Sequence, residues 1–407
     1  MSPCAPVPVA RADGPLLSPW THVAQVAASL AAGMGVGRFV YTPILPLMHA
    51  QAGLSTDAGA HLATANYVGY LLGALAGTLL PALVRSRAAL RGSLLLLVGT
   101  LAAMPATHST GVWIALRLLA GVASALIFVV AASSLLGHLR DHPPHLPGWA
   151  FGGVGAGIAL SGLLVLALRS VGDWQAAWWA AAALATALAA AAWKLRPEAP
   201  AAPSTGALGP TVDPWFGALF VSYCLEGVGY IVAGTFLVAT IGQSSPGWIG
   251  SGAWVLVGLA AVPSSALWAR LGRRWSRPGL LFVALVIQAV GIALPALVGG
   301  VAAALVSAVL FGGTFIGIST LALAAGAQLR FPRSVALLTA GYSVGQILGP
   351  LAVAPLLQHG YRPALLLAAA VVLAAAVAAA VLRTGFPQHT VAVRRSVPDQ
   401  GIRTAGR

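Results

Sequence analysis

Twelve long apolar runs constrain this chain more than any other feature of its sequence. Each run has roughly 20 residues or more, which is the length that an α-helix needs to cross the hydrocarbon core of a bilayer. Because lipid offers no hydrogen-bonding partners, we expect each run to form a membrane-spanning α-helix. The predicted spans are 21–48, 58–84, 89–107, 111–137, 147–169, 174–194, 214–241, 248–271, 278–298, 300–326, 333–357 and 362–383.

The composition is that of a protein whose solvent is lipid. Apolar residues make up 58% of the 407 residues and charged residues only 7%, whereas a soluble domain has about 25% charged residues. The net charge of +14 sits in short clusters between the apolar runs, which argues against a nucleic-acid-binding face. Cys4 lies in a tail and Cys224 in a run, so no disulfide framework is expected.

The basic residues predict how the helices are oriented. Of the 22 Lys and Arg residues, Arg38 and Arg117 lie within runs, and Arg169 and Arg362 fall in loops on one side. The remaining 18 all fall in segments on the other side, which the positive-inside rule assigns to the cytoplasm. We therefore expect both termini to be cytoplasmic.

A proline-rich segment divides the runs into six and six. The expected domains are a cytoplasmic N-terminal tail (1–20), an N-terminal six-helix bundle (21–194), a cytoplasmic linker (195–213), a C-terminal six-helix bundle (214–383) and a cytoplasmic C-terminal tail (384–407).

The two halves are related in sequence. Residues 35–45 begin with Gly-Val-Gly and are echoed by 227–237, and residues 157–163 are echoed by 345–351. Six spans return the chain to the side that it left, so the two copies have the same orientation. This pattern is typical of parallel repeats, which are related by an axis along the membrane normal.

Local motifs add a family resemblance over about 20–385. The run Trp268-Ala-Arg-Leu-Gly-Arg-Arg274, the motif Arg117-Leu-Leu-Ala-Gly121 and the helix start at Asp173-Trp174 resemble those of the major facilitator superfamily. Residues 37–48 resemble a poorly characterised bacterial branch of that superfamily. The resemblance implies an all-α protein of twelve transmembrane helices in two parallel six-helix repeats. It also implies a secondary transporter in which a central site opens to one side at a time.

One acidic residue lies in the middle of a predicted span. Of the eight Asp and Glu residues, only Glu226 is far from a tail, loop or helix end. An ion at this depth costs roughly 2.5–3.5 kcal/mol, so it should face a cavity or a partner. We predict that Glu226 is the proton-coupling residue. The alternative is a structural ion pair or a helix-packing hydrogen bond.

Two arginines also lie within spans. In the repeat alignment Arg38 lies about one helical turn, roughly 6 Å, from the level of Glu226. We expect Arg38 to pair with Glu226 in an empty site and to bind an anionic substrate in a filled one, since a guanidinium offers a bidentate fork. Alternatively, Arg38 only anchors its span to neighbouring carbonyls. Arg117 belongs to a motif that, by resemblance, is linked to proton transfer; the alternative is an arginine that snorkels from a helix end.

Polar and aromatic side chains near these ions predict a mixed pocket for a small organic solute. For each of them, helix packing is an equally good explanation. The candidates are Tyr41, Asn66, Tyr67, Tyr70, Tyr230, Trp254 and Gln346.

Two other patterns have a simpler explanation. Gly152-Gly-Val-Gly-Ala-Gly157 resembles a dinucleotide-binding loop, but it lies within an apolar run, so we interpret it as a helix-packing surface. His138, Asp141, His142 and His145 share a proline-rich loop, and we do not expect them to bind a metal. No cofactor is expected, and the sequence has no Gly-Lys-Ser or Gly-Lys-Thr motif for ATP.

The sequence thus predicts a proton-coupled exporter of a small organic solute, monomeric and located in a bacterial inner membrane. The main alternative is proton-coupled uptake of an organic anion. A non-transporting membrane sensor or scaffold would need partner-binding domains or long loops, and a membrane-embedded enzyme would need a catalytic cluster. Neither is visible in the sequence, so we expect no enzymatic activity.

Overall fold

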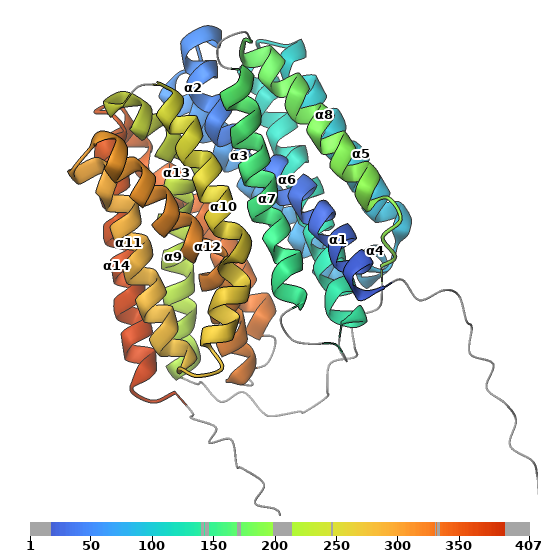
Figure 1. Cartoon of the computed structure of the whole chain (residues 1–407), viewed down its shortest axis with the longest axis vertical. Coiled ribbons are helices and arrows are strands. Elements are labelled where there is room, and N and C mark those ends of the chain that lie inside the picture. The colour runs from blue at the N-terminus through green and yellow to red at the C-terminus, as the bar shows by residue number, and fades with distance from the viewer. Residues whose placement is uncertain are drawn as a thin grey trace, which may run out of the picture.

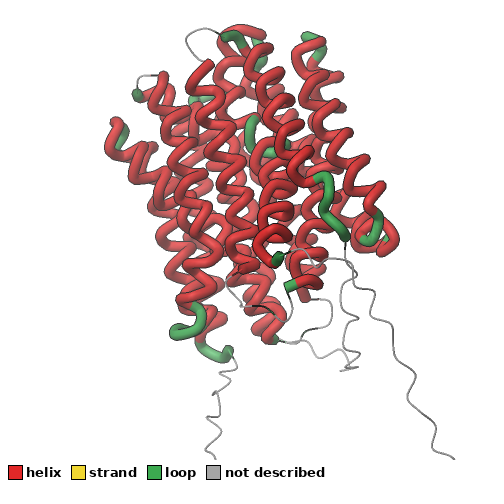
Figure 2. Tube along the Cα trace, turned by 45° about the vertical axis from the view of Figure 1, so that its right-hand side comes forward, coloured by secondary structure: helices red, strands yellow, loops and turns green. Residues whose placement is uncertain are grey.

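The computed structural model of the chain describes residues 18–139, 142, 146–168, 172–197, 214–245, 247–329, 331 and 334–386. Over this part of the chain the regular secondary structure is entirely helical (Figures 1 and 2). The elements are α1 (Pro19–Leu30), the π-helix η1 (Ala31–Val36), α2 (Tyr41–Ala52), α3 (Thr56–Leu79), α4 (Pro81–Val84), α5 (Arg87–Ala103), the 3-10 turn η2 (Met104–Ala106), α6 (Thr110–His138), α7 (Leu146–Leu168), α8 (Trp174–Ala192), α9 (Pro214–Ser244), α10 (Gly247–Leu271), α11 (Arg277–Leu297), α12 (Gly300–Gln328), α13 (Ser334–Leu357) and α14 (Tyr361–Arg383).

Twelve helical segments of the described chain are long and apolar enough to cross a membrane, and they coincide with the twelve predicted spans. Two predicted runs are interrupted, the first span (described below) and the second. The run 58–84 was expected to be continuous, but α3 ends at Leu79 and the short α4 begins at Pro81. The reason is Pro81, which has no backbone N–H and disfavours a helical conformation at Leu80. Most of the predicted linker and both predicted tails lie outside the described residues.

The helices form two groups, which lie side by side in Figure 1. Helices α1 to α8 make up the first group and α9 to α14 the second, as the chain order predicts. The groups meet where α7 packs along α10 and where α3 packs against α13. We call these groups the N-bundle and the C-bundle.

Glycines permit the close approach of α7 and α10. A Cβ atom at Gly155 would lie 2.5 Å from the Val262 backbone nitrogen, and one at Gly152 would lie 2.6 Å from the Val262 carbonyl oxygen. Gly153 and Gly157 lie in the same way against the first span, within the N-bundle. Small residues allow backbones to touch in this manner. The glycine run of α7 is therefore a packing surface, which confirms the interpretation made from the sequence.

The first span is broken in its middle. After η1 the chain leaves the helix at Gly37 and resumes as α2 at Tyr41. Because Pro43 has no N–H, the Phe39 carbonyl cannot be satisfied by the usual helical bond, and it accepts instead from the Thr42 N–H at 3.2 Å. Arg38 lies within this break, so its side chain projects from irregular backbone in the centre of the molecule.

The outer surface fits a bilayer. Leucine and valine side chains are exposed along the helices, and exposed tryptophans mark both ends. Trp20, Trp149 and Trp275 lie at the end that also carries Arg85, Arg87, Arg273 and Arg274, and Trp248 lies at the opposite end. Tryptophan prefers the membrane–water interface. We call the arginine-bearing end the basic end.

Candidate functional site: the buried ions of the central layer

Arg38 is held mainly by aromatic faces. Its side chain is 2% exposed, and its guanidinium carbon lies 4.4 Å from the Tyr70 ring centroid and 4.9 Å from that of Tyr67. Nη2 donates a hydrogen bond to the Gln346 side-chain oxygen of α13, but Nε has no hydrogen-bond partner among the residues that the structure describes. The guanidinium thus bridges the two bundles and keeps an unused donor.

Glu226 is surrounded by polar groups but forms no hydrogen bond with the described residues. Its side chain is 0% exposed, and neither carboxylate oxygen has a hydrogen-bond partner in the described part of the chain. The Gln288 amide and the Tyr342 hydroxyl approach the carboxyl group, yet no contact meets normal hydrogen-bond geometry. An ionised carboxylate in such a setting would be destabilised, because no well-formed hydrogen bond from the described residues replaces its hydration.

Glu226 and Arg38 do not form the expected ion pair. Arg38 contacts Gln346 instead, and Gln346 in turn donates to the Tyr230 hydroxyl at 3.4 Å. Tyr230 stacks on Tyr342 with ring centroids 5.5 Å apart. The prediction of a direct pair in an empty site is therefore wrong for this conformation, since an amide and two phenols separate the ions.

Arg117 has the anchoring role that was considered as an alternative for Arg38. It is 1% exposed and donates to the Gly37 and Arg38 carbonyl oxygens at 3.1 and 3.2 Å. The break in the first span leaves these carbonyls without the usual helical partners. The alternative of a snorkelling arginine is wrong, because the side chain points into the molecule and not toward an interface.

Two predicted pocket residues instead support Arg117. Tyr41 lies with its ring 4.9 Å from the Arg117 guanidinium and donates to the Gly59 carbonyl oxygen at 2.9 Å. Asn66 donates from Nδ2 to the Arg117 carbonyl oxygen at 2.9 Å. Both side chains bind the protein's own backbone, so the structure favours helix packing over ligand contact for these two residues.

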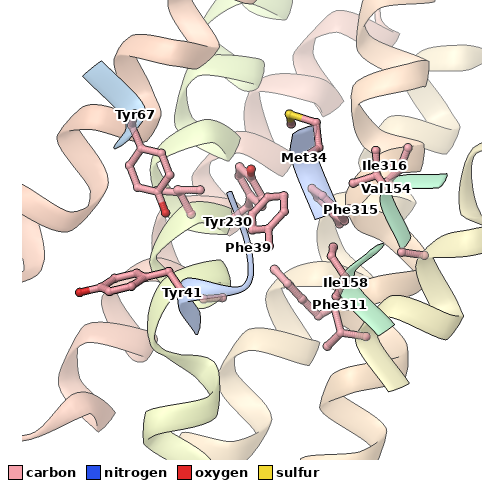
Figure 3. Packing of buried hydrophobic residues seen from close by; sticks show 14 of the residues in the cluster. Met34, Phe39, Tyr41, Tyr67, Val154, Ile158, Tyr230, Phe311, Phe315 and Ile316 are labelled. Atoms are coloured by element: carbon pink, nitrogen blue, oxygen red, sulfur yellow. The ribbon is translucent and has the colours of Figure 1, made fainter. Parts of the chain in front are cut away.

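Of the remaining predicted residues, Tyr67, Tyr70 and Gln346 contact Arg38, and Tyr230 contacts Gln346. Figure 3 shows Tyr67 and Tyr230 among the buried residues at the centre. The Tyr67 hydroxyl lies 2.8 Å from the Thr235 hydroxyl of α9, across the bundle interface. Tyr230 stacks on Phe315 at 5.3 Å. Trp254 lies 6.4 Å from the Phe39 ring, and its buried Nε1 has no partner.

Several residues of this layer were missed by the sequence analysis. Phe39 packs edge-on against Phe315 of the C-bundle, with ring centroids 5.7 Å apart (Figure 3), and its ring lies 6.4 Å from that of Trp254. Gln288 of α11 has no hydrogen bond to the described residues at either side-chain atom. A search of the apolar runs for uncharged amides as well as for charges would have found Gln288. Phe39 lies in the motif 37–48, directly after Arg38, and that position is the one sequence signal that distinguishes it from the other phenylalanines.

The centre is closed toward the end opposite the basic end. Thr42 donates to the Gly234 carbonyl oxygen at 2.5 Å, and the Tyr361 hydroxyl lies 3.1 Å from His49 Nε2. Beyond these contacts lies a cavity of about 640 Å³ between the bundles, with Pro43 and Gln243 among its lining residues. Neither Arg38 nor Glu226 is among the described residues that line it.

The loop histidines do not form a described metal site. The rings of His138 and His142 are 6.1 Å apart, and His22 stacks on His138 at 4.1 Å. Asp141 and His145 lie outside the described residues. Among the described residues no group of three or more metal-type ligands is found.

Two helical bundles that enclose buried ions define a class, the secondary transporters of the major facilitator superfamily. The chain belongs within it to the family described as "uncharacterised MFS-type transporter YbfB", whose model matches residues 30–380. No curated protein matches the sequence. The fold is similar to the crystal structure of a mutant of the nucleoside transporter NupG, with a TM-score of 0.67 and 14% identity over 89% of this chain and 99% of that chain. Family and fold favour a multi-pass membrane transporter over a sensor, scaffold or enzyme.

Proposed function

We propose that this protein exports a small organic solute in exchange for protons, with Glu226 as the proton carrier and Arg38 as the substrate-binding ion. The observation that carries the proposal is the isolation of Glu226: a fully buried carboxyl group without a hydrogen bond. Because burial favours the neutral form, the closed state holds a proton there. When the bundles rock apart and water enters, the carboxyl group can release it.

A polar path offers a mechanism for coupling. Arg38, Gln346, Tyr230 and Tyr342 link the substrate ion to the surroundings of Glu226. A substrate that draws Arg38 away from Gln346 frees the amide and shifts the hydroxyl groups beside the carboxyl. Substrate and proton then influence each other's binding, as linkage requires.

The site chemistry supports a flat, partly anionic substrate. Arg38 Nε and Trp254 Nε1 are buried donors without partners, and the rings of Phe39, Phe315 and Tyr230 surround them. A planar ring would stack among these side chains, and a carboxylate or a carbonyl oxygen would accept from the donors. Aromatic carboxylates and nucleosides are therefore the first compounds to test.

We further propose an orientation in the membrane and an oligomeric state for the protein. The basic end faces the cytoplasm of a bacterial inner membrane, with both termini on that side and Arg117 confined to a structural role. The protein acts as a monomer, since each chain holds its own central site.

The test uses purified protein in liposomes with an imposed pH gradient and a panel of aromatic carboxylates, nucleosides, sugars and amino acids. Wild type should accumulate a substrate of the panel, and an uncoupler should abolish that accumulation. Glu226→Gln should lose gradient-driven accumulation but keep solute exchange. The chain has only one other glutamate, so Glu198→Gln is the matched control. Gradient-driven transport by Glu226→Gln at the wild-type rate would overturn the proposal.

A second candidate is proton-coupled uptake of an organic anion. It is favoured by the absence of an ion pair between Arg38 and the described residues, which leaves Nε of the guanidinium available to a carboxylate. The same liposomes separate the two candidates: with an outward solute gradient, export by exchange acidifies the interior, whereas symport makes it alkaline.

A further inference from the structure

We propose that a cavity at the basic end binds the headgroup of an anionic phospholipid. The cavity has a volume of about 760 Å³ and lies between Trp149 of α7, in the N-bundle, and the facing parts of α10, α11 and α12 in the C-bundle. Three arginines line it: Arg270, Arg273 and Arg277. It is separate from the central layer that contains Arg38 and Glu226.

These arginines lack anionic partners. No acidic residue is found among the described residues that line the cavity, and none of the three forms an ion pair with the described chain. Arg277 donates one hydrogen bond, from Nη1 to the Ala324 carbonyl oxygen at 2.7 Å. Most guanidinium donors therefore remain available, and guanidinium groups bind phosphate oxygens with a bidentate fork.

The rim of the cavity is apolar where the bilayer begins. Pro263, Leu267 and Arg270 follow one another at helical spacing along α10, so that an apolar stripe leads to the basic group. Leu267 is 50% exposed and Trp149 is 44% exposed, and both line the cavity. This change from apolar to basic residues along α10 matches a phospholipid. Its acyl chain would lie along Leu267, and its phosphate would contact the arginines.

The charge of the site selects among lipids. A cluster of arginines beside membrane helices attracts anionic headgroups, whereas the choline group of a zwitterionic lipid would meet repulsion. Phosphatidylglycerol provides a phosphodiester without that cation. Because the cavity has walls from both bundles, a bound lipid would also connect the surfaces that move when the bundles rock.

The test is native mass spectrometry of the full-length protein, released from micelles that contain phosphatidylglycerol or phosphatidylcholine. The wild-type protein should retain phosphatidylglycerol in preference to phosphatidylcholine. The double variant Arg270→Gln/Arg273→Gln should bind it at least about tenfold more weakly, since each basic residue contributes about 1 kcal/mol. The matched control is Arg85→Gln/Arg87→Gln, which removes two exposed charges from the same end outside the cavity and should keep wild-type lipid binding.

The phosphate that binds in the cavity could belong to a lipid headgroup or to a soluble compound, and a competition experiment distinguishes the two. Inorganic phosphate and glycerophosphoglycerol, which lack acyl chains, should not displace the lipid at equal concentration. Displacement by either would assign the site to soluble phosphate and overturn the proposal. Equal phosphatidylglycerol binding by the cavity variant and the control would also overturn it. Thermal unfolding of each variant checks that the fold is retained, and the result does not depend on transport activity.

Discussion

At the residue scale, the buried ionisable side chains Arg117, Arg38 and Glu226 differ in the partners that surround them. Arg117 is satisfied by backbone carbonyls, Arg38 by one amide and aromatic faces, and Glu226 by no hydrogen bond. An ion with fixed partners suits a structural role, because breaking those partners is costly. Ions with few partners are the ones that can change partners during transport, so Arg38 and Glu226 are the candidates for function.

The bidentate contact proposed between the Arg38 guanidinium and the solute can be tested by a substitution that keeps the positive charge. Arg38→Lys should weaken solute binding about tenfold, since an ammonium group cannot donate in bidentate fashion and stacks less well on tyrosine. The measurement is the solute concentration that gives half-maximal exchange in liposomes. Arg85→Lys, at an exposed position, is the control. Wild-type affinity in Arg38→Lys would argue against a forked contact.

Gln288 should act on the proton and not on the solute. Gln288→Leu keeps a similar volume but removes the amide that approaches Glu226. We expect gradient-driven transport to slow several-fold and to change its pH profile, while solute exchange without a gradient stays unchanged. Gln25→Leu, in α1, controls for the loss of a glutamine. If both rates fell together, Gln288 would have only a packing role.

At the element scale, the broken first span explains why a buried arginine is needed. The sequence predicted the span, and Pro43 and Pro46 within it are residues that bend or interrupt helices. It did not predict that the break would free the Gly37 and Arg38 carbonyls, nor that Arg117 would bind them. Such a contact depends on how α6 packs against the break, which has no local signal in either segment.

Removing the Arg117 side chain should therefore lower the thermal stability of the protein more than it affects the coupling of solute transport to protons. Arg117→Gln leaves two buried carbonyls short of donors, at about 1–3 kcal/mol for each unsatisfied group. We expect a clear fall in the thermal unfolding temperature in detergent. Arg91→Gln, which removes a partly buried arginine bound to the Trp193 carbonyl, should have a smaller effect. An unchanged unfolding temperature in Arg117→Gln would contradict the anchoring role.

The close packing of α7 against α10 can be tested by adding a methyl group at the contact. Gly155→Ala places a methyl group against the α10 backbone, and overpacking of this kind costs about 1–3 kcal/mol. We expect lower thermal stability and slower transport, because the bundles cannot close at this point. Gly99→Ala, where a methyl group meets no atom within 4 Å, should be neutral. Equal behaviour of the two variants would contradict the close packing.

At the scale of the whole molecule, the sequence predicted the architecture better than the site. Twelve apolar runs and a repeat at half-length were sufficient for the helices and their grouping. Of the predicted site residues, Tyr67, Tyr70, Tyr230, Trp254 and Gln346 lie in the layer around Arg38, but Tyr41 and Asn66 support Arg117. The separation of Arg38 from Glu226 could not be predicted, because helix alignment gives their depth but not the side chains between them.

In the proposed exchange mechanism, the solute and a proton compete through Glu226. The most direct measurement is the pH change of a weakly buffered detergent solution of the protein when a transported solute is added. For proton-coupled export we predict that wild type and Glu198→Gln release protons on solute binding and that Glu226→Gln releases none while still binding the solute. Proton release by Glu226→Gln equal to that of wild type would contradict the claim.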